Sequence, residues 1–314
     1  MTRSRKQSSS GSEIMKYHNF LAPLFDYSDL PFRILCQRYG ADACCAPMAN
    51  SMAIERDPKK LSEVDAHPDE KNIGVQVIGG DPKKVGKACM LIADSMSHVK
   101  WLNLNAGCPS PRTMRCGGGS DMLLHPKKIF ESVKLMRKAD LPVSVKIRVS
   151  NGVDGTLDLC RKIEAEGADS VIIHGRTVKQ GYSGKSDWEL IRHVKEGLDI
   201  PVVGNGDIQS ASEGRRLVRE GYCDSFMVGR AAMSNPLLFK DQKPQTIGGM
   251  FCLLEEYICL CSKYYEKMPI VPIRLKAMNF IRGARSAARL RNSISNAKSV
   301  EEILEIKKKE SAKN

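Results

Sequence analysis

Several side chains able to do chemistry stand directly after short apolar runs of this 314-residue chain. The polar members of this set are Gln76, Asn105, Lys146, His174 and Asn205. Lysine and histidine can hold negative charge or move protons, and the amide groups can hydrogen-bond to the edge of a planar heterocycle. Cys108 follows Asn105 by three residues, in LNLNAGCPSPRTMRCGGG, and could serve as a nucleophile or a proton donor. The pattern therefore predicts a reactive centre built at the ends of several strands.

The apolar runs alternate with amphipathic helical stretches from Asn19 to about Phe239. We identify eight strands: NFLAPL, DACCAP, NIGVQVIGG, WLNLNA, PVSVKIR, DSVIIHG, PVVGNGD and DSFMVGR. Short β-branched runs that alternate with helices indicate parallel strands with helical crossovers. Eight such units predict an α/β fold of the (β/α)8 TIM-barrel type, and no GxGxxG motif follows the first strand to favour a doubly wound sheet. In such a barrel the carboxyl ends of all strands meet on one rim.

Two glycine-containing turns, GNGDI (204–208) and VGRAA (228–232), close the last two predicted strands. In TIM barrels these loops commonly hold a phosphate, because glycine lets backbone N–H groups approach the anion. Arg230 can add a charge-assisted contact. Sugar phosphates and FMN both remain candidates for this corner.

Lys146 and His174 favour a flavin among these phosphorylated ligands. A cation beside the pyrimidine edge of a flavin stabilises its anionic reduced form, and Gln76 and Asn105 carry the amides that such an edge needs. A phosphate-binding or Schiff-base lysine, and an ordinary rim histidine, remain open from the residues alone.

The pattern changes after Phe239, where DQKPQTIGG reads as a linker and helices follow. We predict a disordered basic tail over residues 1–18, a barrel over 19–240 and a small all-helical domain over 249–314. Cys252, Cys259 and Cys261 are expected in the core of its first helix. Its middle helix is expected to be basic, with several cations on one face: Arg274, Lys276, Arg282, Arg285 and Arg289.

The charge balance points to a polyanionic partner. Lys and Arg outnumber Asp and Glu by 49 to 36, for a net charge of +13. Such an excess suits nucleic acid or an acidic membrane surface, although a merely solubilising face remains open. The eleven cysteines show no CxxC spacing, and no apolar run reaches bilayer length. We therefore expect reduced thiols, no metal site, no membrane span and a cytoplasmic protein.

LNLNAGCPS, VSVKIR, VIIHGRT, VVGNGDI and FMVGRAA, in this order, resemble the tRNA-dihydrouridine synthases. The resemblance covers the barrel from about Phe20 to Phe239. It continues more weakly through FIRGARSAARLRNSISNAKSVEEILEI, which is similar to the family's tRNA-binding helical domain. It implies that FMN, reduced by NADPH or NADH, delivers a hydride to C6 of a uracil in tRNA. Cys108, which matches the cysteine of the family's GCP motif, would then protonate C5 to give 5,6-dihydrouridine.

The resemblance and the charge pattern together assign the site residues. The expected FMN-binding residues are Pro23, Leu24, Gln76, Asn105, Lys146, His174, Asn205, Gly206, Asp207, Gly229 and Arg230. The expected tRNA-contacting residues are Asn105, Arg112, Arg176, Arg282, Arg285 and Arg289. We expect the glycine-rich loop 112–119 to act as a mobile lid, Cys116 to be dispensable, and the protein to be a monomer.

The sequence departs from the family in two places. The first strand ends Ala22-Pro23-Leu24-Phe25, where the family usually has methionine followed by a small residue, and the second ends CCAPMANSMAI. Two alternatives remain. One is a small-molecule flavin reductase of the dihydroorotate or dihydropyrimidine dehydrogenase kind, which would need no basic helical appendage. The other is a non-catalytic RNA-binding barrel, which would hold no flavin.

Overall fold

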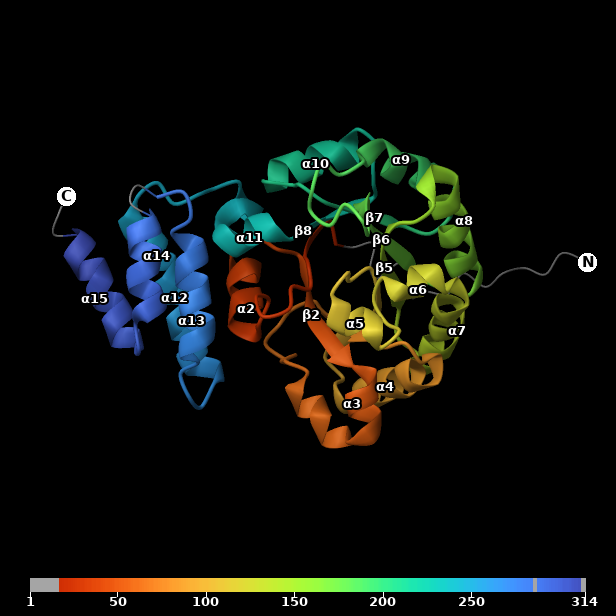
Figure 1. Ribbon diagram of the computed structural model, residues 1–314, viewed down its shortest axis with the longest axis horizontal. Helices are drawn as coiled ribbons and strands as arrows, with labels where there is room; N and C mark the ends of the chain where they lie inside the picture. The colour runs from red at the N-terminus through yellow and green to blue at the C-terminus, as the bar shows by residue number, and fades with distance from the viewer. Residues whose placement is uncertain (1–16, 285–286, 312–314) are drawn as a thin grey trace, which may run out of the picture.

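In the computed structural model, which describes residues 17–284 and 287–311, eight parallel strands close into a barrel in sequence order (Figure 1). The strands are β1 (Asn19–Leu21), β2 (Ala43–Asn50), β3 (Ile73–Ile78), β4 (Val99–Ala106), β5 (Val143–Val149), β6 (Ser170–Thr177), β7 (Val202–Asn205) and β8 (Ser225–Val228). β1 pairs with both β2 and β8, which closes the sheet. The predicted TIM barrel is confirmed.

Helices surround the barrel and bury the outer faces of its strands (Figure 1). They are α2 (Leu30–Arg38), α3 (Ser51–Arg56), α4 (Pro82–Ser95), α5 (Pro111–Arg115), α6 (Asp121–Leu124), α7 (Pro126–Met136), α8 (Gly152–Ala165), α9 (Trp188–Glu196), α10 (Ala211–Arg219) and α11 (Arg230–Ser234), with 3-10 turns at Pro58–Glu63, Arg137–Ala139 and Pro236–Lys240. Every residue of β3, β7 and β8 is buried, as near-continuous apolar runs require when both faces of a strand are covered. α4 begins at Pro82, and the side chain of the preceding Asp81 caps it by accepting from the Lys83 and Lys84 amides.

The C-terminal residues form α12 (Ile247–Tyr264), α13 (Ile270–Phe280), α14 (Ala287–Asn296) and α15 (Val300–Ser311). They lie to one side of the barrel, next to α2 and α11 (Figure 1). α12 begins two residues before the predicted boundary, since the Thr246 side chain caps it by accepting from the Gly249 amide.

The prediction of one long basic helix with its cations on a single face was wrong. α13 ends at Phe280, and Gly283, at φ +86°, breaks the chain direction before α14 begins. Lys276 is completely buried, and Arg274 donates to the carbonyls of Ser295 and Ala297. The expectation of three core cysteines in α12 was also wrong: Cys261 is buried, whereas Cys252 and Cys259 are exposed.

The helices share one hydrophobic core with the barrel. Phe280 of α13 stacks on Phe32 of α2 with ring centroids 6.4 Å apart. Asp29, which caps α2, accepts from the Tyr257 hydroxyl at 2.6 Å and pairs with Lys276 at 3.3 Å. Removing the helices would therefore expose a core face of α2 and leave Asp29 without these two partners.

None of the helices in the described ranges is both long and apolar enough to span a bilayer.

Candidate active site

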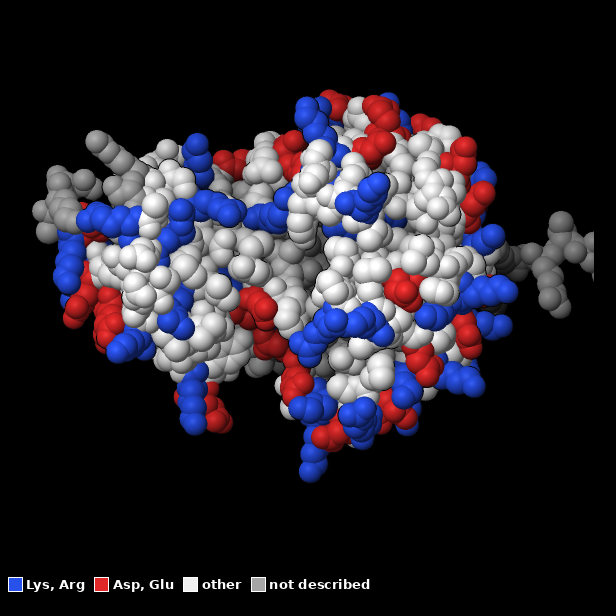
Figure 2. Space-filling model, in the orientation of Figure 1, with Lys and Arg blue, Asp and Glu red and all other residues white. Residues whose placement is uncertain are grey.

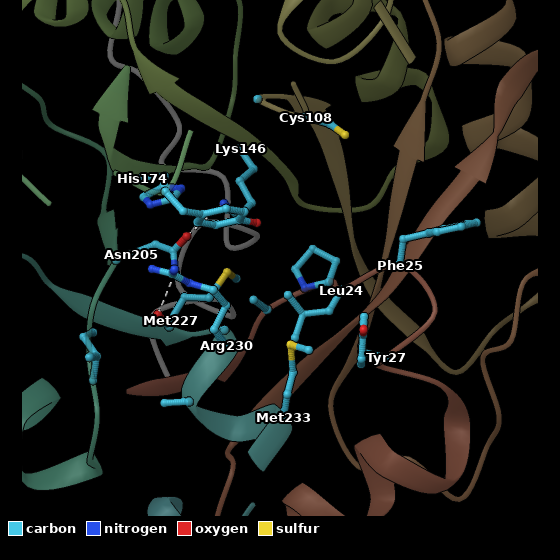
Figure 3. Close-up of a pocket in the computed structure, with 18 of the residues that line it drawn as sticks. Leu24, Phe25, Tyr27, Cys108, Lys146, His174, Asn205, Met227, Arg230 and Met233 are labelled. Atoms are coloured by element: carbon cyan, nitrogen blue, oxygen red, sulfur yellow. Dashed lines mark hydrogen bonds between the residues drawn. The ribbon is translucent and has the colours of Figure 1, made fainter. Parts of the chain in front are cut away.

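A cavity of about 730 Å3 opens at the carboxyl ends of the strands (Figure 3). It brings together the catalytic residue and all the cofactor-binding residues predicted from the sequence: Pro23, Leu24, Gln76, Asn105, Cys108, Lys146, His174, Asn205, Gly206, Asp207, Gly229 and Arg230. Strand register explains this convergence, because Asn105 lies opposite Lys146, and His174 lies opposite Asn205, across parallel neighbours.

Buried amide side chains form a hydrogen-bonded chain across the cavity floor. Asn105 Nδ2 donates to Gln76 Oε1 at 2.8 Å, and Gln76 Nε2 donates to Asn103 Oδ1 at 2.7 Å. Asn103 Nδ2 in turn donates to Ser144 Oγ at 2.8 Å. These hydrogen bonds determine the orientation of each amide. The side chains of Gln76 and Asn105, which line the cavity, are therefore held in place.

Cys108 is held by its backbone on both sides. Its N–H donates to Asn105 Oδ1 at 2.9 Å, and its carbonyl accepts from the Ser120 amide at 2.9 Å. The thiol donates to Thr113 Oγ1 at 3.8 Å. Asn105 therefore links the position of the thiol to the amide chain of the cavity floor.

The glycines after Cys108 lie close to neighbouring segments, and the lid role of loop 112–119 stays a prediction. Residues 111–115 form the short helix α5, and Gly119, at φ +60°, passes so close to Cys108 that a Cβ would lie 2.6 Å from its carbonyl oxygen. An alanine at this position would meet both a strained backbone and this contact. The loop thus helps to place the thiol.

Lys146 and His174 face the same wall of the cavity (Figure 3). Lys146 Nζ donates to Asn205 Oδ1 at 3.0 Å, and Asn205 Nδ2 donates to the Met227 carbonyl at 2.8 Å. Burial, together with the nearby Arg148, lowers the pKa of Lys146 to about 8. The ammonium group keeps two further N–H donors for a ligand with negative charge.

His174 is neutral, because burial and the surrounding cations lower its pKa to about 2. Arg176 Nη1 lies 3.3 Å from His174 Nε2. Arginine can only donate, so Nε2 accepts and the ring proton resides on Nδ1. The imidazole is therefore a hydrogen-bond donor of defined orientation and carries no charge.

An ionic chain joins the ends of β6, β7 and β8. Arg176 Nη2 lies 2.7 Å from both carboxylate oxygens of Asp207, and Arg230 Nη2 lies 3.2 Å from Oδ1. Burial alone would raise the pKa of Asp207, but hydrogen bonds from Arg176 and the Ser186 amide outweigh it and lower that pKa. Asp207 thereby positions Arg230 at the cavity edge.

The turn before Asp207 requires glycine. Gly206 has φ +130°, and a Cβ there would lie 2.4 Å from Ser186 Oγ. Backbone of this turn and of Gly229–Ala231 lines the cavity beside Arg230. The corner therefore has the backbone and the cation that a phosphate group needs.

Comparison with known proteins identifies the group to which this arrangement belongs. The family described as "Dihydrouridine synthase (Dus)" matches residues 20–314. The chain belongs to the dihydrouridine synthase family. It is 30% identical over 305 residues to a probable tRNA-dihydrouridine synthase of Aquifex aeolicus, covering 93% of this chain and 95% of the relative. It is 32% identical to tRNA-dihydrouridine synthase B of Pasteurella multocida, covering 73% of this chain and 70% of the relative.

A mouse relative, the tRNA-dihydrouridine(20a/20b) synthase [NAD(P)+]-like protein, is 32% identical over 69% of this chain and 68% of its own length. Among solved structures, a complex of 2-naphthoyl-CoA reductase with 2-naphthoyl-CoA matches at a TM-score of 0.53 and 13% identity, over 71% of this chain and 49% of that one, and this supports the fold alone. Family membership makes the protein a flavin-dependent oxidoreductase. Within the described ranges, no group of three or more His, Cys, Asp or Glu side chains is arranged to hold a metal ion.

Two cavity residues of this dihydrouridine synthase were not among the site residues expected from the sequence. Arg148 is buried and donates to the carbonyls of Gly107, Thr177 and Gly181, which ties the β4, β5 and β6 loops together. Tyr182 lies at the mouth, with the Arg230 guanidinium 4.3 Å and that of Arg148 5.6 Å from its ring centroid. Arg148 stood at a strand end in the sequence, but no motif marked Tyr182, whose loop returns to the rim only in the folded chain.

The predicted tRNA-contacting arginines lie in different settings. Arg112 is exposed on α5, and Arg282 lines the cavity from the turn after α13. Arg289 is exposed but paired with both carboxylate oxygens of Glu310 at 2.8 Å. Arg176 is only 2% exposed and lies beneath the cavity surface, so the structure gives it a positioning role in place of a direct contact. Arg285 lies outside the described residues.

Basic side chains gather on the face that carries the cavity. Figure 2 shows one band across α14 toward α11 and a second group over α5, with a hollow between α11 and α5. A polyanion that spans both groups would cross the cavity mouth.

Proposed function

We propose that this dihydrouridine synthase reduces the C5=C6 bond of a uridine in tRNA to 5,6-dihydrouridine, with FMN as cofactor and NADPH or NADH as reductant. The observation that carries the proposal is the position of the Cys108 thiol. It lies in the same cavity as the Lys146, His174 and Asn205 wall and the phosphate-type corner at Arg230, beneath a mouth flanked by arginines.

The donor set of the cavity fits FMN. The turns at Gly206 and Gly229, with Arg230, would hold the phosphate. Lys146 and the Nδ1–H of His174 would meet the electron-rich edge of the ring system, and Gln76 would face it from the floor. When bound, reduced FMN supplies the hydride.

Cys108 supplies the proton in the proposed reaction. As hydride reaches C6 of the uracil, the electron pair of the C5=C6 bond takes the proton from the Cys108 sulfur at C5. The thiolate that remains regains a proton from water. General-acid assistance of this kind avoids full negative charge on the base. Asn105, which holds the Cys108 amide, keeps the thiol over the reacting carbon.

The target uridine must leave its stack to enter the cavity, and this requires contacts with the phosphate backbone around it. Arg112 and Arg115, exposed on α5, and Arg282, which lines the cavity, would provide them. The small-molecule alternative has no use for these side chains.

The proposal is tested with purified protein, FMN, NADPH and tRNA isolated from a strain that lacks the corresponding enzyme. We expect yellow protein, NADPH oxidation that depends on tRNA, and dihydrouridine at a defined position after mapping. Protein that cannot be reconstituted with FMN would overturn the proposal in favour of a non-catalytic barrel. Reduction of dihydropyrimidine precursors without any action on tRNA would overturn it in favour of the small-molecule alternative.

FMN affinity is expected to fall as the pH rises through about 8. With the pKa of Lys146 near 8 in the free protein, an anionic ligand favours its charged form and raises that pKa. Binding therefore takes up a proton above pH 8, and affinity decreases there. Flavin fluorescence titrations between pH 7 and 9.5 should show a several-fold loss in the wild type. Lys146→Met should bind more weakly and without this loss, and an equal loss in both proteins would contradict the assignment.

Arg282→Glu is expected to raise the KM for tRNA about tenfold near 0.1 M salt, because a phosphate contact becomes a repulsion. The slope of the logarithm of the binding constant against the logarithm of the salt concentration should decrease by about one, which corresponds to one phosphate contact. Steady-state kinetics and filter binding at several salt concentrations measure both. Arg219→Glu, an equal charge change at the end of α10, is the matched control and should lie within twofold of the wild type. Equal effects of both variants would mean that Arg282 contributes only through the net charge of the protein and makes no specific contact with tRNA.

The monomeric state and the cytoplasmic location expected from the sequence remain part of this proposal.

A further inference from the structure

Two large aromatic side chains are strongly exposed in the described part of the chain, and both line the cavity. Phe25 is 56% exposed and Tyr182 is 58% exposed. The other exposed large hydrophobic residues there are aliphatic and lie outside the cavity lining: Met90, Leu124, Val153, Met268 and Val271. A single exposed apolar residue on a protein surface needs no explanation. Two exposed aromatic rings that both line the same cavity call for one.

Phe25 stands at the tip of a turn whose backbone is firmly held. The Leu24 carbonyl accepts from the amides of Tyr27 and Ser28, and the buried Ser28 hydroxyl accepts from the Leu24 amide at 2.8 Å. Asp26 has φ +64°, an unusual value for a residue other than glycine. Phe25 belongs to neither hydrophobic cluster of the described residues.

The ring points away from the reactive end of the cavity. In Figure 3, Phe25 lies across the cavity from His174 and Lys146, with its ring directed outward, while Leu24 is the neighbour on the inner side. A molecule at the bottom of the cavity would therefore meet Leu24, and Phe25 would meet only what stands at the mouth.

The following inference rests on the proposed function. When a uridine leaves its stack, the bases beside it lose a stacking partner. RNA-binding proteins commonly stack aromatic side chains on such bases. We propose that Phe25 stacks on a nucleobase adjacent to the reduced uridine and so positions the RNA strand at the mouth.

Substitutions at Phe25 test stacking against simple hydrophobic contact. We expect Phe25→Ala and Phe25→Leu to lower kcat/KM for tRNA about tenfold, mainly through KM, and Phe25→Trp to retain wild-type values. Flavin content and the rate of flavin reduction by NADPH without tRNA should not change in any variant. Met90→Ala, on the outer helix α4, is the control for loss of an exposed apolar side chain.

A spectroscopic readout reports the contact itself. With 2-aminopurine on either side of the target uridine, binding of wild type or Phe25→Trp should quench its fluorescence at one of the two positions, and Phe25→Ala should not. Wild-type kinetics and quenching in Phe25→Leu would overturn the inference. A defect confined to NADPH oxidation would also overturn it, by assigning the ring to the reductant. Failure of the wild type to act on tRNA would instead overturn the proposed function.

Discussion

Replacing Cys108 with alanine is expected to lower turnover on tRNA by about 10²- to 10⁴-fold, the usual contribution of a positioned general acid. In the proposed reaction the thiol is the proton source at C5, and its loop is held by Asn105 and Ser120. FMN binding and its reduction by NADPH should remain at wild-type levels, since the wall of Lys146, His174 and Asn205 lies on β5, β6 and β7. Single-turnover mixing of reduced enzyme with tRNA measures the loss directly.

Cys116→Ala is the matched control, because this cysteine lies on the same loop but is exposed. It should remain within about twofold of the wild type. Comparable losses in the two variants would show that the loop cysteine takes part in the reaction. A Cys108→Ala enzyme that also fails to hold flavin would make the residue structural.

The second large effect is expected on stability, from Arg33→Met. Arg33 is completely buried, and its guanidinium donates to both carboxylate oxygens of Glu70, at 2.6 and 2.9 Å, and to the Ser28 carbonyl at 2.6 Å. Methionine would leave the buried Glu70 carboxylate without its counter-ion. The free energy of unfolding should fall by about 3–5 kcal/mol, as urea unfolding at pH 7 would measure.

A double variant separates the loss of the attraction between Arg33 and Glu70 from the cost of leaving the buried Glu70 carboxylate unpaired. Arg33→Met with Glu70→Leu removes both ions, and we expect it to recover at least half of the lost stability. If the double variant is less stable than Arg33→Met alone, Glu70 is stabilised by its remaining contacts, such as the His67 amide, and the cost has been assigned to the wrong group.

The barrel and its reactive rim could be predicted because both follow from local patterns. Short apolar runs, β-branched in β3, β5, β6 and β7, mark the strands. Closure of the parallel sheet then brings Gln76, Lys146 and His174 together. The residues that were missed depend on contacts between distant segments. Tyr182 reaches the rim through its loop, and Arg148 acts through one carbonyl after β4 and two at and beyond the end of β6.

The helical part shows the same limit more clearly. Lys276 was expected on a basic surface, but its partner Asp29 lies 247 residues away in the sequence and draws it into the interior. Burial lowers the pKa of Lys276, and the Asp29 carboxylate opposes that effect. No periodicity in a single helix records such a pairing. Arg176 was assigned to tRNA by resemblance for a related reason: its ion pair with Asp207 is formed only when β6 and β7 are neighbours.

The core that α12 and α13 share with α2 has a consequence for selectivity along the RNA. Because Phe280 stacks on Phe32 and Lys276 pairs with Asp29, the separation between the helical surface and the Cys108 thiol is established as the chain folds, before any RNA arrives. Under the proposed function, with tRNA docked on the helical part, the uridine that reacts would be the one whose distance from the docked part of the tRNA equals that separation. The cavity would then need only to exclude bases other than uracil, and substitutions at the α2–α13 contact would be expected to shift the position of reduction.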